Sequence, residues 1–353
     1  MCNPTRGAPI PRPTILPPDR AIRALLARWL PGAAVSLTAA ASGASTPVWR
    51  VDVAGRGPDA GETFYVRLGE EPGERRDGEV RVHQVLRAAG VRVPEVVAWE
   101  GLPPELDRAA TLTRAIPGRP LKEVARTIPA AEVAAIARAA GRDLAVIGAI
   151  PVQGFGWIDL PDAATGALRA EHPARRTWLA EYDAALEEVI ALGLLAPEHL
   201  PALAARVAAW REGADEDSGA AWLAHGDFDA SHIFCTPGNI DGSPYTYTGI
   251  IDFGEARGAD PFYDLGHALL HDGEDGIPPL IDHLLDGACD RTGTLLSPTD
   301  HAAIQAQAIA IGVRHLAIAS RRGSPYAATL VTRLGHLLDG PFAPDGDGRG
   351  VRP

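Results

Sequence analysis

Four side chains that can bind a metal ion or accept a proton stand at the ends of apolar segments between positions 222 and 253. His225 and Asp227 follow the run AWLA, His232 comes five residues after Asp227, and Asp252 follows TGII twenty residues after His232. Apolar strands bury their own backbone and leave the residues at their ends to project, which is a common way to build a site. Carboxylates and imidazoles placed in this way can serve as a general base and as metal ligands.

The spacing of these residues follows the logic of a kinase catalytic loop and metal loop. It reads H-x-D, a polar residue five positions after the aspartate, and then I-D-F-G. In kinases the first aspartate accepts the proton of the substrate hydroxyl, the side chain five residues on binds a metal ion, and the second aspartate binds the metal that bridges the phosphates. The pattern therefore predicts phosphoryl transfer.

On these residues the chain resembles the aminoglycoside/macrolide phosphotransferases, whose fold is protein-kinase-like. HGDFDASHIF is similar to the catalytic loop of that family, and GIIDFGEARGADPFYDLGHAL is similar to its metal loop and the helix that follows. LTRAIPGRPL resembles the hinge between the family's lobes, and FYVRLGE resembles its phosphate-binding strand. The resemblance extends over residues 33–340. It implies an α+β, bilobal fold, with a small antiparallel β lobe and a larger, mainly helical lobe.

The resemblance assigns a role to each matching position. Asp227 is the implied catalytic base, and a carboxylate suits that role because a sugar hydroxyl needs orientation more than deprotonation in a loose transition state. Asp252 and His232 are the implied ligands of Mg²⁺, a hard cation that prefers oxygen. Arg67 takes the place of the lysine that contacts the α- and β-phosphates of ATP or GTP, and Glu79 is its implied partner on the following helix.

Two further segments are implied to contact the nucleotide. The turn with Ser42, Gly43 and Ser45 offers backbone N–H groups and hydroxyls to the phosphates. Thr113 and Ala115 offer hinge backbone groups to the purine. His225 is expected to brace the catalytic loop, and Asp260 and Asp264 to cap the next helix and hold that loop.

The chain departs from the family pattern at two positions. The family more often has asparagine at the position of His232, although its macrolide-kinase branch has histidine there. Imidazole is a softer ligand than an amide oxygen, so His232 can bind metal directly, act through water, or favour Mn²⁺. Arg67 replaces lysine with a group that is bulkier, always charged and able to hold two oxygens at once.

Alternatives remain open at this point. Asp229 is the rival catalytic base. The cluster of His225, Asp227, His232, Asp252 and His267 is compatible with a metal-dependent hydrolase, although the chain has no HExxH spacing. Arg67 and His232 are also compatible with a catalytically silent nucleotide-binding module. His267 and His271, four residues apart, are expected to be core or surface histidines rather than metal ligands.

Composition excludes several classes of protein. Among 353 residues there are 33 basic and 45 acidic side chains, for a formal net charge of −12, and a single lysine, Lys122. Lys122 follows Leu121, so there is no Walker A motif, and a Schiff-base lysine would have to be this one. The acidic balance argues against nucleic acid or a membrane surface as partner. The three cysteines form no disulfide framework, and without a signal peptide or membrane span in the sequence a cytoplasmic location is expected.

The elements that must position the candidate residues follow from periodicity. Residues 1–18 are predicted to be a disordered, proline-rich arm, 19–115 a nucleotide-binding lobe, 116–340 a catalytic and acceptor-binding lobe, and 341–353 a flexible tail. The first lobe contains a predicted helix after Asp19, three alternating strands between 35 and 70, a helix from Glu79, and two more strands. The second contains predicted helices near 130–148, 173–193 and 198–212, strands and turns over 222–253, and helices from Tyr263 to Leu338.

These observations together predict an ATP- or GTP-dependent O-phosphotransferase that moves the γ-phosphate to a hydroxyl of a small molecule, an aminoglycoside or macrolide antibiotic. The helices at 173–212 are expected to form the acceptor wall. Their acidic residues are expected either to face solvent or to meet an amino sugar; they are Glu181, Asp183, Glu187 and Glu188.

Overall fold

A computed structural model describes residues 19–39, 47–55, 61–74, 76–158, 166–212, 219–238 and 243–340. The chain divides into two compact units. The first comprises Met1–Pro117 with Asp159–Leu168, and the second comprises Gly118–Ile158 with Arg169–Pro353. The predicted arm at 1–18 and the predicted tail at 341–353 lie outside the described residues.

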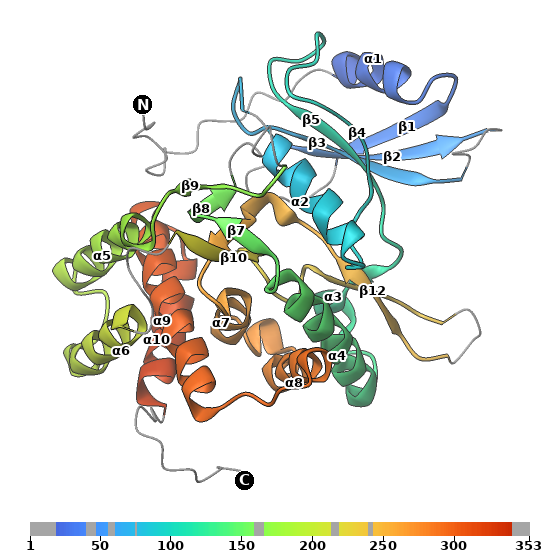
Figure 1. The fold of residues 1–353 in the computed structure, drawn as a ribbon. Coiled ribbons are helices and arrows are strands. Elements are labelled where there is room, and N and C mark those ends of the chain that lie inside the picture. Colours follow the sequence, from blue (N-terminus) through green and yellow to red (C-terminus); the bar gives the residue numbers. More distant parts are fainter. Residues whose placement is uncertain are drawn as a thin grey trace. The chain divides into compact units, whose positions relative to one another are not determined.

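The first unit is built on a five-stranded antiparallel sheet in the order β1-β2-β3-β5-β4 (Figure 1). Its strands confirm the predicted antiparallel β lobe and have these bounds: β1 Ala34–Ala39, β2 Val48–Ala54, β3 Thr63–Leu68, β4 Val96–Glu100 and β5 Ala110–Arg114. Its helices are α1 Asp19–Trp29 and α2 Asp77–Ala88. In β3 every second residue is buried, so Phe64, Val66 and Leu68 share the inner face as the alternation predicts. Helix α1 packs the side chains of Ile22 and Leu25 into the same core.

The second unit is mainly helical, as the sequence predicts. Its helices are α3 Leu121–Val124, α4 Ala130–Ile147, α5 Arg175–Ala191, α6 Leu200–Glu212, α7 Tyr263–Leu270, α8 Ile281–Thr292, α9 Pro298–Arg321 and α10 Tyr326–Asp339. Helix α9 packs against α5, α6, α7 and α10. It is the one described helix that is long and apolar enough to cross a membrane by length and composition, but 67% of its most apolar window is buried inside this unit. Its apolar character is therefore explained by the core.

Two small sheets complete the second unit and carry its loops. Their strands are β6 Arg119–Pro120, β7 Pro151–Gln153, β8 Phe155–Ile158, β9 Ala170–His172, β10 Ala220–Ala224, β11 Ile233–Thr236, β12 Thr246–Ile250 and β13 Arg257–Ala259. The strand orders are β7-β10-β13-β8-β9 and β12-β11-β6. The predicted strands at 222–253 are found, whereas β7, β8 and β9 lie between the helices predicted near 130–148 and 173–193, where the sequence predicts no strand. Strands of three or four residues are too short to show a period of two.

Candidate active site

The loop from His225 to His232 joins β10 to β11, and the side chain of Asp264 in α7 holds its backbone. The two carboxylate oxygens of Asp264 accept hydrogen bonds from the backbone N–H groups of His225, at 2.8 Å, and of Gly226, at 3.0 Å. The carboxylate thus fixes the backbone directly before Asp227. The predicted role of Asp264 in holding the catalytic loop agrees with this geometry, but the expectation that it caps α7 is wrong, because it lies in the first turn and the N-cap residue is Phe262.

Gly226 allows the loop to turn sharply at this point. Its φ is +92°, and a Cβ at this position would lie 1.9 Å from the carbonyl oxygen of Glu255. Only glycine combines this backbone conformation with so close an approach. The glycine therefore brings the 225–232 loop against the segment that follows Asp252.

His225 joins the catalytic loop to the metal loop. Its buried ring donates from Nε2 to the carbonyl oxygen of Ile251 at 2.8 Å, and Nδ1 accepts from the backbone N–H of Asp227 at 3.3 Å. Burial lowers the pKa of His225, so the ring stays neutral with one donor and one acceptor. It acts as the expected brace between the two loops.

Asp227 lies beside His267, a residue of α7. The Oδ1 atom of Asp227 is 3.3 Å from Nε2 of His267, and the side chain of Asp227 is 49% exposed whereas that of His267 is 1% exposed. Nδ1 of His267 donates to the carbonyl oxygen of Phe228 at 3.0 Å, which fixes the ring. Partial burial tends to raise the pKa of Asp227, but the neighbouring imidazole outweighs it and holds that pKa well below its usual range. The carboxylate is thus ionised and open to solvent on one side.

His232 and Asp252 face each other across the two loops. Nδ1 of His232 donates to the carbonyl oxygen of Asp227 at 2.7 Å, so the lone pair of the ring is on Nε2, which lies 3.9 Å from Oδ2 of Asp252. Asp252 has a left-handed backbone, with φ of 67°, and its side chain is 42% exposed. An imidazole nitrogen and a carboxylate oxygen at this separation suit a divalent cation between them.

Asp229, the rival base, is engaged locally. Its Oδ1 atom accepts from the backbone N–H of Ser231 at 2.6 Å and from the Ser231 hydroxyl at 2.5 Å. This is the geometry of an aspartate that closes a turn. It favours Asp227 over Asp229 as the group that meets a substrate.

The structure brings Arg67 and Glu79 together in the first unit. Nη1 of Arg67 lies 3.4 Å from Oε1 of Glu79, and both side chains are less than one-fifth exposed. A second cation, Arg76, donates from Nη1 to the other oxygen, Oε2, of Glu79. Sequence reasoning missed Arg76, although its position three residues before Glu79 at the start of α2 is the spacing of a helical ion pair.

The other predicted nucleotide contacts have different outcomes. Ser42, Gly43 and Ser45 lie outside the described residues. Thr113 is the last residue but one of β5, opposite Tyr65 of β3. The backbone N–H of Ala115 donates to the carbonyl oxygen of Thr63 at 2.9 Å. Of the two backbone groups that Ala115 is expected to offer to the purine, its carbonyl oxygen is therefore the one to consider.

Asp260 does not cap α7. It accepts two hydrogen bonds of 2.7 Å from the guanidinium of Arg175, which is 1% exposed, and one of 3.1 Å from the indole of Trp210. The expectation that Asp260 caps the next helix is therefore wrong. The buried arginine of α5 attracts it instead, because such a charge needs a buried counterion.

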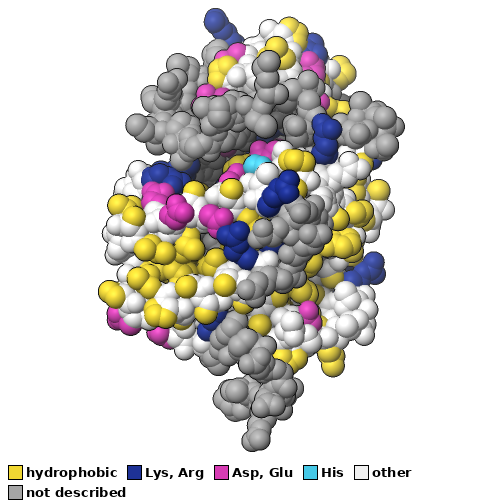
Figure 2. All heavy atoms as spheres, turned by 60° about the vertical axis from the view of Figure 1, so that its left-hand side comes forward, with side chains coloured by type: hydrophobic (Ala, Val, Ile, Leu, Met, Phe, Trp, Pro, Cys, Tyr) yellow, Lys and Arg dark blue, Asp and Glu magenta, His cyan; other side chains and the backbone are white. Residues whose placement is uncertain are grey.

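Three of the four acidic residues expected at the acceptor wall are paired with arginines. Glu181 lies 3.4 Å from Arg314, Asp183 is bound by Arg211, and Glu188 is bound by Arg321. Figure 2 shows acidic and basic side chains next to each other on the second unit, above a band of hydrophobic ones. This pairing weakens the case that these carboxylates recognise an amino sugar.

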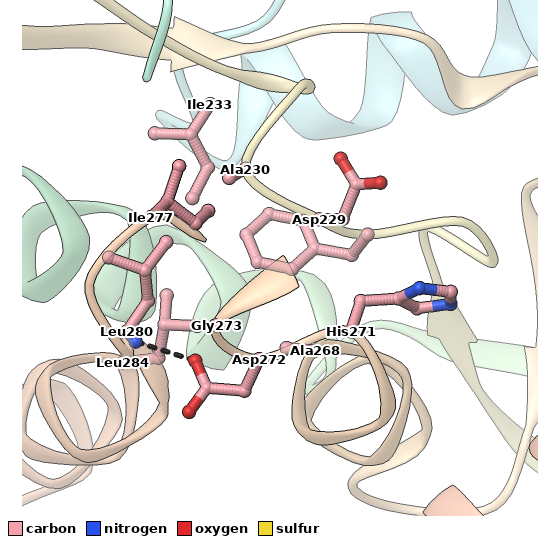
Figure 3. Close-up of a pocket in the computed structure, with 11 residues that line it drawn as sticks. Asp229, Ala230, Ile233, Ala268, His271, Asp272, Gly273, Ile277, Leu280 and Leu284 are labelled. Atoms are coloured by element: carbon pink, nitrogen blue, oxygen red, sulfur yellow. Dashed lines mark hydrogen bonds between the residues drawn. The ribbon is translucent and has the colours of Figure 1, made fainter. Parts of the chain in front are cut away.

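A pocket lies behind the catalytic loop in the second unit. Figure 3 shows its walls, with Asp229 and His271 on one side and Asp272 below. Most of the remaining lining is apolar: Phe228, Ala230, Ile233, Ala268, Ile277, Leu280 and Leu284. Asp272 accepts from the backbone N–H of Leu280 at 2.6 Å and closes the loop that forms the floor.

Comparison with known proteins adds the following similarities. The model of the phosphotransferase enzyme family matches residues 36–301. No curated protein matches the chain. Among solved structures, the aminoglycoside phosphotransferase APH(4)-Ia, in complex with ADP and hygromycin B, is 17% identical with a TM-score of 0.62, over 90% of this chain and 98% of that one.

Two further structures have the same fold. A GDP and kanamycin complex of the aminoglycoside phosphotransferase APH(2″)-IIia is 16% identical with a TM-score of 0.61, over 90% of this chain and 97% of that one. A choline/ethanolamine kinase family protein from Mesorhizobium loti is 17% identical with a TM-score of 0.57, over 92% of this chain and 95% of that one. The kinase-like α+β fold expected from the sequence is confirmed.

Proposed function

The chain belongs to the phosphotransferase enzyme family and is a small-molecule kinase, and from this premise we propose that it transfers the γ-phosphate of ATP or GTP to a hydroxyl of an aminoglycoside or macrolide antibiotic. The observation that carries the proposal is the juxtaposition of a partly exposed, ionised Asp227 with the facing pair His232 and Asp252 on two braced loops. The solved structures named above support it, because they include complexes with nucleotides and with aminoglycosides.

Asp227 supplies the base of the reaction. Its carboxylate accepts a hydrogen bond from the acceptor hydroxyl and so directs a lone pair of the hydroxyl oxygen at the phosphorus. The carboxylate then takes the proton of the hydroxyl as the new P–O bond forms. A low pKa suits this role, because in a loose transition state the hydroxyl keeps its proton until late. Orientation is therefore the main contribution, and the bonds of Asp264, Gly226 and His225 provide it.

His232 and Asp252 would hold the Mg²⁺ ion of the nucleotide. The donor set fits a divalent cation because the Nδ1–H bond of His232 leaves Nε2 directed towards the carboxylate of Asp252. When bound, the ion neutralises charge on the β- and γ-phosphates. The nitrogen ligand makes Mn²⁺ a good substitute, since imidazole suits softer ions than Mg²⁺.

Arg67 would contact the α- and β-phosphates from β3. Its guanidinium is held by Glu79, which is also bound by Arg76, and Arg76 lies 3.7 Å from a second carboxylate, that of Glu74. A guanidinium fixed in this way can hold two phosphate oxygens at once. This arrangement supports nucleotide binding by the first unit in the absence of a lysine.

The class of the acceptor molecule is the part of the proposed reaction that the acidic residues of α5 do not decide. The solved structures of similar fold include proteins that bind kanamycin and hygromycin B and a member of the choline/ethanolamine kinase family. The acidic residues of α5 are paired with arginines, so they do not favour a cationic acceptor over a macrolide. A panel of acceptors is required.

The test is transfer of labelled γ-phosphate from MgATP and from MgGTP to kanamycin, hygromycin B, a macrolide and choline, with the site of phosphorylation located by mass spectrometry. Asp227→Asn should lower kcat by about 10²- to 10⁴-fold, with an unchanged thermal midpoint. Asp229→Asn is the matched control and should retain most of kcat. Nucleotide binding without turnover on any acceptor would favour the silent module, and equal activity of Asp227→Asn would remove Asp227 as the base.

A further inference from the structure

Three histidines gather behind the catalytic loop. His267 and His271 lie one turn apart on α7, and His315 projects from α9, which packs against α7. One ring nitrogen from each lies within 4.8 Å of the others. The ring centroids of His267 and His271 are 4.5 Å apart, and those of His267 and His315 are 5.5 Å apart. The proposed phosphoryl transfer gives His271 and His315 no role.

The outer nitrogens of two of these rings are fixed by oxygen acceptors. Nδ1 of His267 donates to the carbonyl of Phe228 at 3.0 Å. Nδ1 of His271 lies 2.9 Å from the hydroxyl of Tyr326 and 3.2 Å from a carboxylate oxygen of Glu274, and that hydroxyl itself donates to Glu274. Histidines that bind metal ions almost always donate their other N–H to a carbonyl or carboxylate in this way.

The inner nitrogens of the same two rings are buried without a hydrogen bond. Among the described residues, Nε2 of His267 and Nε2 of His271 have no hydrogen-bond partner, and the two side chains are 1% and 10% exposed. A buried polar atom left in this state is costly unless a ligand satisfies it. Nε2 of His271 therefore presents a lone pair inside the protein, whereas Nε2 of His267 lies 3.3 Å from the Asp227 carboxylate and shares a proton with it until an ion replaces that proton.

Asp227 lies at ligand distance from one member of this cluster, His267. Two ligands of a tetrahedral ion with bonds of about 2.0–2.1 Å lie about 3.3 Å apart, and Oδ1 of Asp227 is 3.3 Å from Nε2 of His267. We propose that His267, His271 and His315 form a binding site for a transition-metal ion of the zinc class, with the carboxylate of Asp227 as fourth ligand. This site is separate from the pair His232 and Asp252.

A metal ion can reach the three histidines from solvent, and nearby carboxylates attract it. The side chain of Asp227 is half exposed, so an ion from solvent reaches His267 past this carboxylate. The carboxylate of Glu274 contacts His271 directly, at 3.2 Å, and the charge of Asp229 favours a cation at His267. His271 also lines the pocket in Figure 3. Binding displaces the proton that His267 shares with Asp227, as metal binding to histidine requires.

An occupied site would inhibit the kinase. The oxygen of Asp227 bound to the ion is no longer available to the acceptor hydroxyl, so phosphoryl transfer stops while the nucleotide still binds. This consequence rests on the proposed function, whereas the metal site does not. Spectroscopic binding therefore decides the proposal, and the activity measurement is secondary to it.

The test uses the full chain, freed of metal by a chelator and titrated with Co²⁺, whose tetrahedral complexes absorb strongly in the visible range, followed by displacement with Zn²⁺. The informative variants are His315→Ala and His271→Ala. His301→Ala is the matched control, because His301 is an exposed residue of the same helix α9. His232→Asn tests whether the signal arises from the nucleotide-metal pair instead. Thermal unfolding in chelator confirms that each variant is folded.

The expected result is one tetrahedral Co²⁺ per chain in the wild type, His301→Ala and His232→Asn, with at least a tenfold loss of affinity in His315→Ala and His271→Ala. Zn²⁺ should inhibit phosphoryl transfer by the wild type and much less that by His315→Ala. The proposal is overturned by the lack of a tetrahedral Co²⁺ spectrum, by a spectrum that His315→Ala leaves unchanged, or by one that His232→Asn abolishes. If no acceptor is phosphorylated at all, the Co²⁺ spectra still decide.

Discussion

The imidazole of His267 lies 3.3 Å from the carboxylate of Asp227, Nε2 to Oδ1, and is itself fixed by a bond to the carbonyl of Phe228. A buried ring thus supports a half-exposed carboxylate from behind. The contact keeps Asp227 ionised and sets the direction in which its second oxygen faces. Two consequences, for activity and for stability, can be measured.

His267→Ala should move the acid limb of the kcat/KM profile to higher pH. Without the imidazole, the partial burial that raises the pKa of Asp227 is no longer outweighed. We expect about a tenfold lower kcat near neutral pH from the lost orientation. The measurement is a pH–rate profile with Mg²⁺ as the only metal, and His336→Ala, an exposed histidine of α10, is the control. An acid limb that stays in place would show that His267 does not set the ionisation of Asp227.

The same pair predicts a pH dependence of stability. Burial opposes the charged form of His267, but the contact with Asp227 raises its pKa, so this contribution is complete below about pH 6.5 and is lost as the pH rises through the folded pKa. Because the pKa of Asp227 is lowered, protonation of this carboxylate removes the stabilising contribution of the pair only at pH values below about 4. The difference in thermal midpoint between wild type and His267→Ala should therefore be largest near pH 5 and smaller near pH 9. An equal difference at both pH values would contradict the ion pair.

Changing Arg67 and Arg76 to alanine should affect different properties, the KM for nucleotide in the first case and the free energy of unfolding in the second. Arg67→Ala should raise the KM for nucleotide about tenfold and leave the KM for the acceptor unchanged. Arg76→Ala should cost about 2 kcal/mol of unfolding free energy, because Glu79 keeps one cation, without raising the KM for nucleotide. The control is Arg20→Ala on the exposed side of α1. The opposite pattern would make Arg76 the phosphate ligand.

Gly226→Ala should disrupt the catalytic loop. The new Cβ would lie 1.9 Å from the carbonyl of Glu255 in addition to the strain of a positive φ, and we expect a loss of about 3 kcal/mol of unfolding free energy with almost no activity. Gly293→Ala is the matched control, since its φ is +69° but nothing lies within 4 Å of the new Cβ. It should cost about 1 kcal/mol and keep its activity. Equal losses would mean that the clash is relieved by a shift of the loop.

What the sequence predicted well depends on contacts between near neighbours. The alternation of Phe64, Val66 and Leu68 gives β3 directly, and the flanking apolar runs place the loop residues Asp227 and Asp252. Periodicity and turn chemistry are local, so one chain segment contains the whole signal. The helices α4 to α6 were predictable for the same reason.

What the sequence did not predict depends on distant pairs. His267 is forty residues from Asp227. A histidine on an apolar helix is interpreted as a core residue unless the structure shows that the 225–232 loop packs against it. Asp260 binds Arg175 across 85 positions, and only the packed structure shows why it does not cap α7. Strands β7 to β9 are short and are ordered by their neighbours in the sheet, since tertiary pairing outweighs local propensity.

The pair of Arg175 and Asp260 should be essential for the stability of the second unit. Arg175 is 1% exposed and Asp260 9%. Asp260→Asn replaces the bidentate carboxylate by one neutral acceptor and leaves the buried charge with only that acceptor and the backbone carbonyls of Trp210 and Arg211. We expect a loss of about 3–5 kcal/mol of unfolding free energy, measured by urea unfolding. Activity should fall with it, because Asp260 is four residues before Asp264, which holds the catalytic loop. Asp290→Asn, which breaks the exposed pair with Arg138, is the control and should change the midpoint little, since surface ion pairs contribute little. Comparable losses in both variants would show that burial does not decide the strength of the Arg175–Asp260 pair.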